Sequence, residues 1–249
     1  MSQDINVERL LEALIAGDRT AARDVVDQAR KHEADAQGLL MNLYWPAHET
    51  IEKLFRSDTI TQVSYHMATR LLRMLVDQAC GELKTSAPNG KTIFAFSGKA
   101  EGEELAGQMA CDLLESAGFQ VAYCGGGIPA DEILSQVQTR RPDYLVFFSS
   151  QGSDLPGIRG LVDTLREINA VPTTRIAVGG GVFNRAEGLA EEIGIHLVAT
   201  TPLELVELLT SPFATEDVVE ERKAKPASAN RKRAAKALTL AAQQRREAA

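Results

Sequence analysis

The sequence is poor in cysteine and in aromatic residues. Three cysteines occur among 249 residues, and aromatic residues make up 5% of the chain. Cys80, Cys111 and Cys124 are scattered and odd in number, which argues against a disulfide framework and gives no zinc-site spacing. Cys80 and Cys111 fall in helical patterns, so we interpret them as small buried hydrophobic residues.

Long hydrophobic runs are also missing. No apolar stretch approaches the ~20 residues that a membrane-spanning helix needs. The N-terminal stretch MSQDINVERLLEAL is acidic and amphipathic, without the basic start and apolar centre of a signal peptide. We therefore expect a cytoplasmic protein with no membrane partner.

Charge is distributed unevenly along the chain. The net charge is −7, yet the stretch from Arg222 to the end holds nine Lys/Arg and one acid, and the rest holds 18 basic and 33 acidic residues. An acidic body repels nucleic acid, whereas a basic tail attracts it. We interpret residues 213–249 as a charged, flexible tail. Its candidate contacts are nucleic acid or an acidic partner, and a solvated extension is the simpler alternative.

Residues 1–86 have the pattern of a four-helix bundle. Apolar residues recur at helical spacing from Val7 to Ile15, and further helical patterns cover 21–31, 39–55 and about 59–83. We expect Thr20 to cap the second helix and Pro46 to kink the third. Short connections favour antiparallel neighbours, and SAPNGK at 86–91 has the composition of a linker.

After residue 91, short apolar strands alternate with helical patterns. The expected strands cover 91–97, 119–125, 143–150, 175–181 and 195–201, and the expected helices cover about 104–117, 130–140, 156–169, 185–193 and 201–209. This alternation predicts an α/β domain over residues 91–212. We expect a five-stranded parallel sheet in the flavodoxin-like order 2-1-3-4-5, which binds ligands beyond the carboxyl ends of its strands.

The turn after the first expected strand is rich in acids. Glu101, Glu103 and Glu104 open the following helix. Acids in a first helical turn are favoured by the helix dipole and cap free N–H groups, so a structural role stays open beside a ligand-binding role. They also disfavour a phosphate site. The glycines at 125–127 do not form G-x-G-x-x-G and do not follow the first strand, which disfavours a dinucleotide site.

A small helical bundle followed by a Rossmann-like domain resembles the cobalamin (B12)-binding module of methionine synthase, of corrinoid methyl-transfer proteins and of cobalamin light-sensing regulators. In the bundle, AGDRTAARDVV, WPAHETIEKLF and TQVSYHMATRLLR resemble the family pattern Gly-Asp, Pro-Ala and Trp-x9-Glu-His. Phe55 stands at the family's Trp position, and Tyr65 and His66 stand where Glu-His would be. The resemblance, over about residues 5–210, implies that these three side chains cap the upper face of the corrin.

The acidic turn resembles a degenerate form of the family hallmark Asp-x-His-x-x-Gly, whose histidine ligates cobalt from below. By spacing, the matching residues are Glu101, Glu103 and Ala106. A register shifted by one residue gives Gly102, Glu104 and Gly107. Neither register supplies an imidazole, and a carboxylate suits such a metal less well.

The ends of later strands resemble the family's contacts with the nucleotide tail of cobalamin. Ser149 or Ser150 stands for a serine near that tail, with the local alignment off by one residue. Gly179 and Gly180 stand for a Gly-Gly element, where a missing Cβ lets a bulky ligand approach the backbone. His196 takes the acidic position of a Gly-Ala-Asp-like element. No metal ligand is assigned, with Glu103 in the lower-ligand position.

Three interpretations of the missing histidine stay open. The chain binds cobalamin with the cofactor's own base or water below cobalt, or it binds a different tetrapyrrole or modified corrinoid, or it binds none. We expect the first, with the adenosyl or methyl form undefined, in a sensor or regulator rather than an enzyme. The alternatives are a corrinoid carrier subunit of a methyltransferase system and a degenerate, non-binding interaction module. Beyond the corrinoid, we expect a protein partner (a regulator, a kinase or a methyltransferase), with a homodimer as a candidate assembly.

Overall fold

The computed structural model describes residues 2–32, 34–169 and 171–211. The tail predicted over residues 213–249 lies outside these ranges. The described residues as far as Leu208 form one compact unit. Within the described ranges, no helix combines the length and apolar character needed to cross a membrane.

The N-terminal part is helical, as the apolar spacing predicts. Its helices are α1 (Ser2–Ala16), α2 (Arg19–Lys31), α3 (Ala36–Leu39), α4 (Trp45–Arg56) and α5 (Gln62–Cys80). The predicted cap of the second helix was wrong by two residues. The side chain of Asp18, not Thr20, accepts hydrogen bonds from the first backbone N–H groups of α2, at 3.0 Å each.

The predicted third helix has an irregular backbone just before Pro46. Residues Leu40–Tyr44 form a π-helical turn that joins α3 to α4, and Pro46 lies in the first turn of α4. Proline has no N–H to donate to the preceding turn, and a π turn widens the helix at such a point. The interruption predicted at Pro46 therefore takes the form of a π turn rather than a break between helices.

The C-terminal part is built on a parallel sheet. Within the described residues the sheet has five strands in the order β2-β1-β3-β4-β5, which confirms the predicted topology. The strands are β1 (Thr92–Ser97), β2 (Gln120–Tyr123), β3 (Tyr144–Phe148), β4 (Arg175–Gly179) and β5 (Leu197–Ala199). The register pairs Ser97 with Phe148, Phe148 with Gly179 and Gly179 with Ala199, so these strands end level at one edge.

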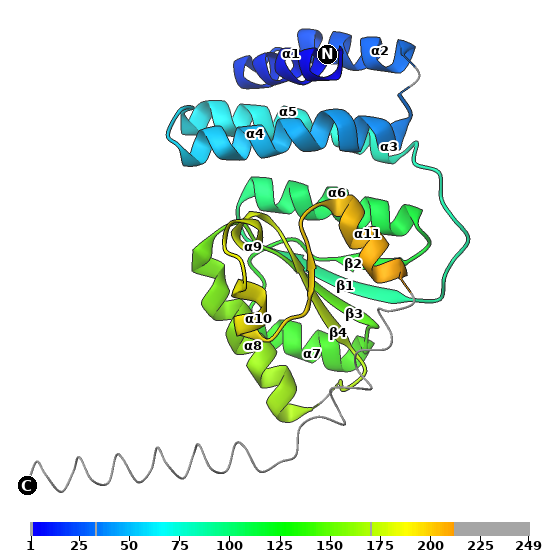
Figure 1. Cartoon of the computed structure of the whole chain (residues 1–249), viewed down its shortest axis with the longest axis vertical. Helices are drawn as coiled ribbons and strands as arrows, with labels where there is room; N and C mark the ends of the chain where they lie inside the picture. Colours follow the sequence, from blue (N-terminus) through cyan, green and yellow to red (C-terminus); the bar gives the residue numbers. More distant parts are fainter. Residues whose placement is uncertain (1, 33, 170, 212–249) are drawn as a thin grey trace, which may run out of the picture. The chain divides into compact units, whose positions relative to one another are not determined.

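Helices cover both faces of the sheet (Figure 1). Helices α6 (Glu101–Ser116) and α11 (Pro202–Thr210) lie on one face, and α7 (Ala130–Arg140), α8 (Leu155–Ile168) and α10 (Leu189–Ile193) lie on the other. The helix predicted at 185–193 is divided into α9 (Gly181–Arg185) and α10 by a turn that contains Gly188, whose φ is +77°.

Helix α6 belongs to the core of the bundle as well as to the sheet. Its residues Leu105, Met109 and Leu113 are buried in the same hydrophobic cluster as the side chains of α1, α2, α4 and α5. Full burial of one such side chain stabilises a fold by about 1.5–3 kcal/mol. A second cluster fills the opposite face of the sheet, beneath α7, α8 and α10. The bundle is therefore anchored to the sheet through α6.

The buried histidine of the bundle generates a pH-dependence prediction. His48 is 5% exposed, and burial lowers the pKa of its imidazole to about 4, with the Arg56 charge adding to the effect. Below pH ~6.5 the unfolded chain takes up a proton at His48 that the folded chain does not. The free energy of unfolding should therefore fall by up to about 3 kcal/mol from this site between pH 7 and pH 4.

Urea unfolding of the wild type and of His48→Gln across this pH range measures that contribution, and the variant should show a flatter dependence. His32→Gln, at an exposed position, serves as the control. Equal slopes for the wild type and His48→Gln would contradict the prediction.

Candidate functional site

The predicted site residues meet where α5 and the level edge of the sheet approach the start of α6. At this edge the aromatic rings of Phe55 and Tyr65 stack, with centroids 4.1 Å apart and planes 15° from parallel. The ring of His66 meets Tyr65 edge-on at 5.6 Å. We call these three residues the aromatic cap.

Tyr65 connects the aromatic cap to the first turn of α6. Its hydroxyl donates to Glu52 Oε1 at 2.7 Å and accepts from the backbone N–H of Gly102 at 3.2 Å. Burial raises the pKa of Tyr65, and the neighbouring Glu52 carboxylate raises it further. Burial also raises the pKa of Glu52, against the hydrogen bond from Tyr65. This contact places the cap directly over the helix start.

Glu101 forms a second connection between α5 and α6. Its carboxylate lies 2.7 Å from Nδ1 of His66 and 3.1 Å from the Arg70 guanidinium, and its carbonyl accepts from Arg73 at 3.2 Å. The hydrogen bond with His66 holds the pKa of Glu101 below its ordinary value, with Arg70 as a further cause. We call these contacts the Glu101 bridge. Because its charges are partly exposed, each pair is worth little in water and weakens with salt.

Glu103 turns inward from the same helical turn and is 2% exposed. Its Oε1 accepts from the backbone N–H groups of Ser150 at 2.6 Å and Gln151 at 3.1 Å, and its Oε2 accepts from Ala100 N–H at 3.2 Å. Burial raises the pKa of Glu103, and the N–H groups of Ser150 and Ala100 oppose that rise. The carboxyl group therefore joins the loop after β1 to the loop after β3.

A narrow crevice lies between α6, the ends of β3 and β4, and α11. Small and polar residues line most of it: Glu103, Ala106, Ala110, Ser149, Ser150, Gly179, Gly180, Ala199, Thr200 and Thr201, with Trp45, Phe148, Pro202 and Leu205 completing the wall. Its volume is about 20 Å³, close to the space that one water molecule needs. The Ser149 hydroxyl donates to Asp154 at 3.1 Å, and the Ser150 hydroxyl accepts from Gly181 N–H at 3.3 Å.

A larger hollow of about 280 Å³ lies on the other face of the sheet, between α7 and α8. Apolar side chains such as Phe96, Phe147 and Ile158 form much of its wall, with Ser97, Lys99 and Asp154 among the polar lining residues. None of the site residues predicted from the sequence lies there. Within the described ranges, no three His, Cys, Asp or Glu residues are grouped to hold a metal ion.

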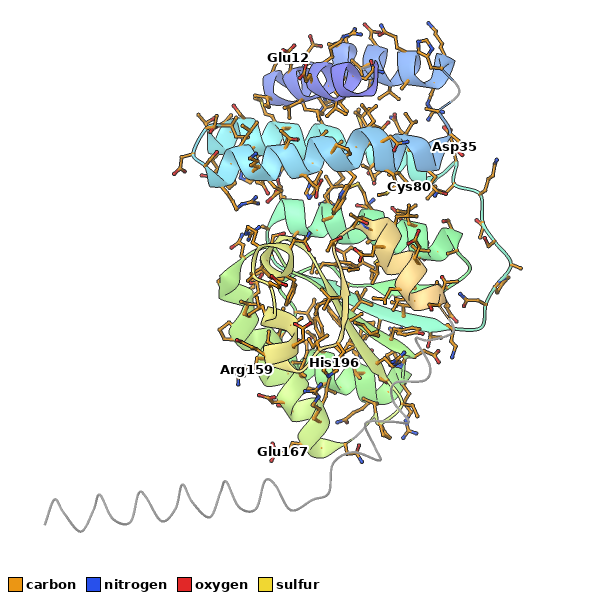
Figure 2. All side chains as sticks on the ribbon, viewed as in Figure 1. Glu12, Asp35, Cys80, Arg159, Glu167 and His196 are labelled. Carbon is orange, nitrogen blue, oxygen red and sulfur yellow. The ribbon has the colours of Figure 1, made fainter. Side chains whose placement is uncertain are left out.

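The structure thus brings the predicted residues into two adjacent groups. The cap residues join Glu101, and a second group lines the crevice: Glu103, Ser149, Ser150, Gly179 and Gly180. His196 is not part of either group. It precedes β5, while the level edge lies at the other end of that strand, and Figure 2 shows it low in the α/β part, away from α4 and α5.

Sequence reasoning missed several residues of the site. Trp45 lies in the wall of the crevice, and Glu52 is the hydrogen-bond acceptor of Tyr65. Glu52 lies one helical turn before Phe55 on α4, so helical spacing could have placed it on the same face. Arg70, four residues after His66 on α5, could have been found by the same spacing.

A helical bundle packed on a doubly wound parallel sheet, with aromatic side chains at the start of α6 and small residues at the carboxyl edge, places this chain in the class of two-part proteins built from a bundle and an α/β domain. The comparisons with known proteins agree with this class. One model described as a B12 binding domain matches residues 7–79, and a second with the same description matches residues 92–207. The chain belongs to the B12-binding domain family, and its cofactor is a cobalamin-type corrinoid.

Two individual proteins are similar to this chain over more than four fifths of its length. The chain is 21% identical over 208 residues to dimethylamine corrinoid protein 1 of Methanosarcina acetivorans, a match that covers 83% of this chain and 96% of that protein. The solved structure of the Methanosarcina barkeri monomethylamine corrinoid protein has the same fold, with a TM-score of 0.72 and 14% identity. That match covers 82% of this chain and 97% of the other.

The chemistry of the crevice suits a corrinoid in part. The φ of Gly180 is +108°, and a Cβ at this position would collide with the Ser149 carbonyl, so the backbones of β3 and β4 approach here as only glycine allows. The glycines and serines provide a small-residue cradle with hydroxyl groups. The wall of the crevice contains the Glu103 carboxyl group and no imidazole. Its glycines and hydroxyl groups suit a bulky polar ligand in kind, and they supply no histidine.

Gly180 generates a prediction about the integrity of the crevice. Gly180→Ala should lower the free energy of unfolding by about 2–4 kcal/mol, because alanine is strained at this φ and its Cβ meets the Ser149 carbonyl. Thermal unfolding, together with the amount of hydroxocobalamin retained after desalting, measures the effect.

Gly160→Ala is the matched control, since Gly160 lies on α8 and a Cβ added there would meet open space. It should be neutral or stabilise the protein by up to about 1 kcal/mol. An equally mild effect of both substitutions would show that close approach at Gly180 is not required.

Proposed function

We propose that this chain is a corrinoid carrier protein of a methyl-transfer system. In this proposal the corrinoid lies between the aromatic cap and the carboxyl edge of the sheet, and a separate methyltransferase is the protein partner. The observation that carries the proposal is the contact of the aromatic cap with the first turn of α6, whose Glu103 lines the crevice, in a chain with two B12 binding domain matches.

The relatives support a carrier over the sensor or regulator expected from the sequence. Their names describe corrinoid proteins associated with dimethylamine and monomethylamine, which are compounds with transferable methyl groups. Each match covers nearly the full length of the relative. A bundle followed by a sheet domain is thus the main content of those proteins as well, and it is the architecture that we assign to the carrier.

A bound corrinoid supplies a cobalt centre that takes up and gives up a methyl group. The residues of this chain hold and shield such a group. Phe55 and Tyr65 present stacked rings that would exclude water from one side, and small residues line the narrow crevice at the carboxyl edge of the sheet. The Glu101 bridge and the contact between Tyr65 and Gly102 must open to admit a corrin between cap and sheet.

That opening is local. The contacts at the start of α6 are polar, whereas Leu105, Met109 and Leu113 further along α6 are buried in the bundle core. Exposed ion pairs contribute about 0–1 kcal/mol each, and a buried apolar side chain contributes more. The cap end of the bundle can therefore separate from the sheet while the opposite end of α6 stays anchored.

The direct test is reconstitution of the full chain. The protein is incubated in dim light with hydroxocobalamin, methylcobalamin or adenosylcobalamin and desalted, and the absorption spectrum is recorded. We expect retention of corrinoid near one equivalent per chain. Failure to retain any of the three forms would contradict the proposal.

Substitution of the cap gives a more specific result. Phe55→Ala removes the stacked ring while leaving the hydrogen bonds of Tyr65 in place, so corrinoid retention should fall about tenfold or more, as expected for ~1.4 kcal/mol of lost contact. Val63→Ala is the control, because Val63 lies on α5 at 69% exposure. Equal retention by both variants would contradict a role for the cap.

Carrier function is tested separately from binding. The loaded protein is reduced with titanium(III) citrate, treated with methyl iodide and desalted again. A carrier should regain the methylcobalamin spectrum in the protein fraction. A retained corrinoid that cannot be remethylated would support the sensor interpretation instead.

A further inference from the structure

We propose that Glu103 is a structural clamp rather than a cobalt ligand, and that a corrinoid bound by this chain has no protein side chain as its lower cobalt ligand. This inference rests on the proposed corrinoid site. In this proposal the lower ligand of cobalt is the cofactor's own base or a solvent molecule. No histidine of this chain ligates the cobalt.

The hydrogen bonds of Glu103 account for both of its oxygen atoms. Oε1 accepts from two consecutive backbone N–H groups of the loop after β3, and Oε2 accepts from the N–H that precedes α6. Backbone N–H groups at a buried position are costly to leave unpaired. Rotation of the carboxyl group toward a ligand would therefore break three hydrogen bonds between the two loops.

The packing around Glu103 also disfavours another rotamer. A Cβ at Gly98 would collide with Glu103 Oε2 and would come within 2.6 Å of Asp154 Oδ2, so the carboxyl group fills the space beside this glycine. The Asp154 carboxylate in turn accepts from the Ser149 hydroxyl at 3.1 Å. The carboxyl group is thus enclosed by backbone and side chains of both loops, on the side facing into the fold.

The histidines of the chain have other positions and partners. His66 lies in the cap, and its Nδ1 lies 2.7 Å from the Glu101 carboxylate at the start of α6. His48 is buried in the bundle, His196 precedes β5, and His32 follows α2. None of these four residues lies in the wall of the crevice below the cap.

The size of the crevice agrees with this assignment. At about 20 Å³ it is far smaller than the space that a benzimidazole nucleotide fills. A base held in this crevice would require its walls to separate, and the residues that line it would offer hydroxyl, backbone and carboxyl groups but no imidazole.

Electron paramagnetic resonance of the loaded full-length chain distinguishes the candidate lower ligands. The protein is prepared with nitrogen-15 histidine and with unlabelled histidine, loaded with hydroxocobalamin and reduced to the cobalt(II) form. An axial nitrogen splits each cobalt line, and replacement of nitrogen-14 by nitrogen-15 changes that splitting. We expect identical spectra from the two preparations.

The form of the shared spectrum narrows the source of the ligand. Nitrogen splitting that is independent of the label assigns the cofactor's own base, and absence of nitrogen splitting assigns an oxygen ligand, which the spectrum of loaded Glu103→Gln then identifies as solvent or carboxylate. A label-dependent splitting would overturn the inference and leave the carrier proposal intact. Failure to retain corrinoid at all would contradict the carrier proposal and this inference with it.

The clamp role has its own readout, which is independent of the cofactor. Glu103→Gln removes the charge and offers a single acceptor oxygen, so the Tm should fall by about 4–8 °C. Glu104→Gln, in the same helical turn, is the control and should change the Tm by less than about 2 °C. The cobalt(II) spectrum of loaded Glu103→Gln should equal that of the wild type. A changed spectrum with an unchanged Tm would show that Glu103 is a ligand and not a clamp.

Discussion

The hydrogen bonds of a single buried carboxyl group define the lower side of this site. Glu103 joins the loop after β1 to the loop after β3, at the point where the strand order of the sheet reverses. In open α/β sheets this switch point is where ligands bind. In this chain the Glu103 side chain occupies the switch point. Its hydrogen bonds fix the start of α6 and the positions of Ser149 and Ser150.

Helix α6 transmits this constraint to the bundle. Its first turn contacts the cap through Glu101 and Gly102, and its buried face belongs to the bundle core. The position of the cap over the sheet therefore depends on where α6 begins, which in turn depends on Glu103. A substitution at this one residue acts on both parts of the protein.

The fold was largely predictable from the sequence, and the details of the site were not. Short apolar runs that alternate with helical patterns predicted every strand and the sheet order. The strands of a parallel sheet are buried on both faces, so they appear in the sequence as continuous hydrophobic segments. The resemblance to B12-binding modules implied that Phe55, Tyr65 and His66 lie together, and their rings are in contact. The direction of Glu103 could not be predicted, since it depends on N–H groups 47 and 48 residues away in the sequence. The strand predicted over residues 195–201 already put His196 at its start, and the structure places His196 just before β5, away from the carboxyl edge of the sheet.

The first turn of α6 directs two of its acids to different parts of the protein. A glutamate at position 103 can reach backbone donors of the β3 loop, and an ionised or neutral carboxyl group accepts through both oxygens. An acid at position 101 has no imidazole beside it on the sheet domain and instead pairs with His66 of the cap. Glu103 thus joins two loops at the carboxyl edge of the sheet, and Glu101 joins the first turn of α6 to α5 of the bundle. Both acids of this turn use their carboxyl groups for contacts within the chain.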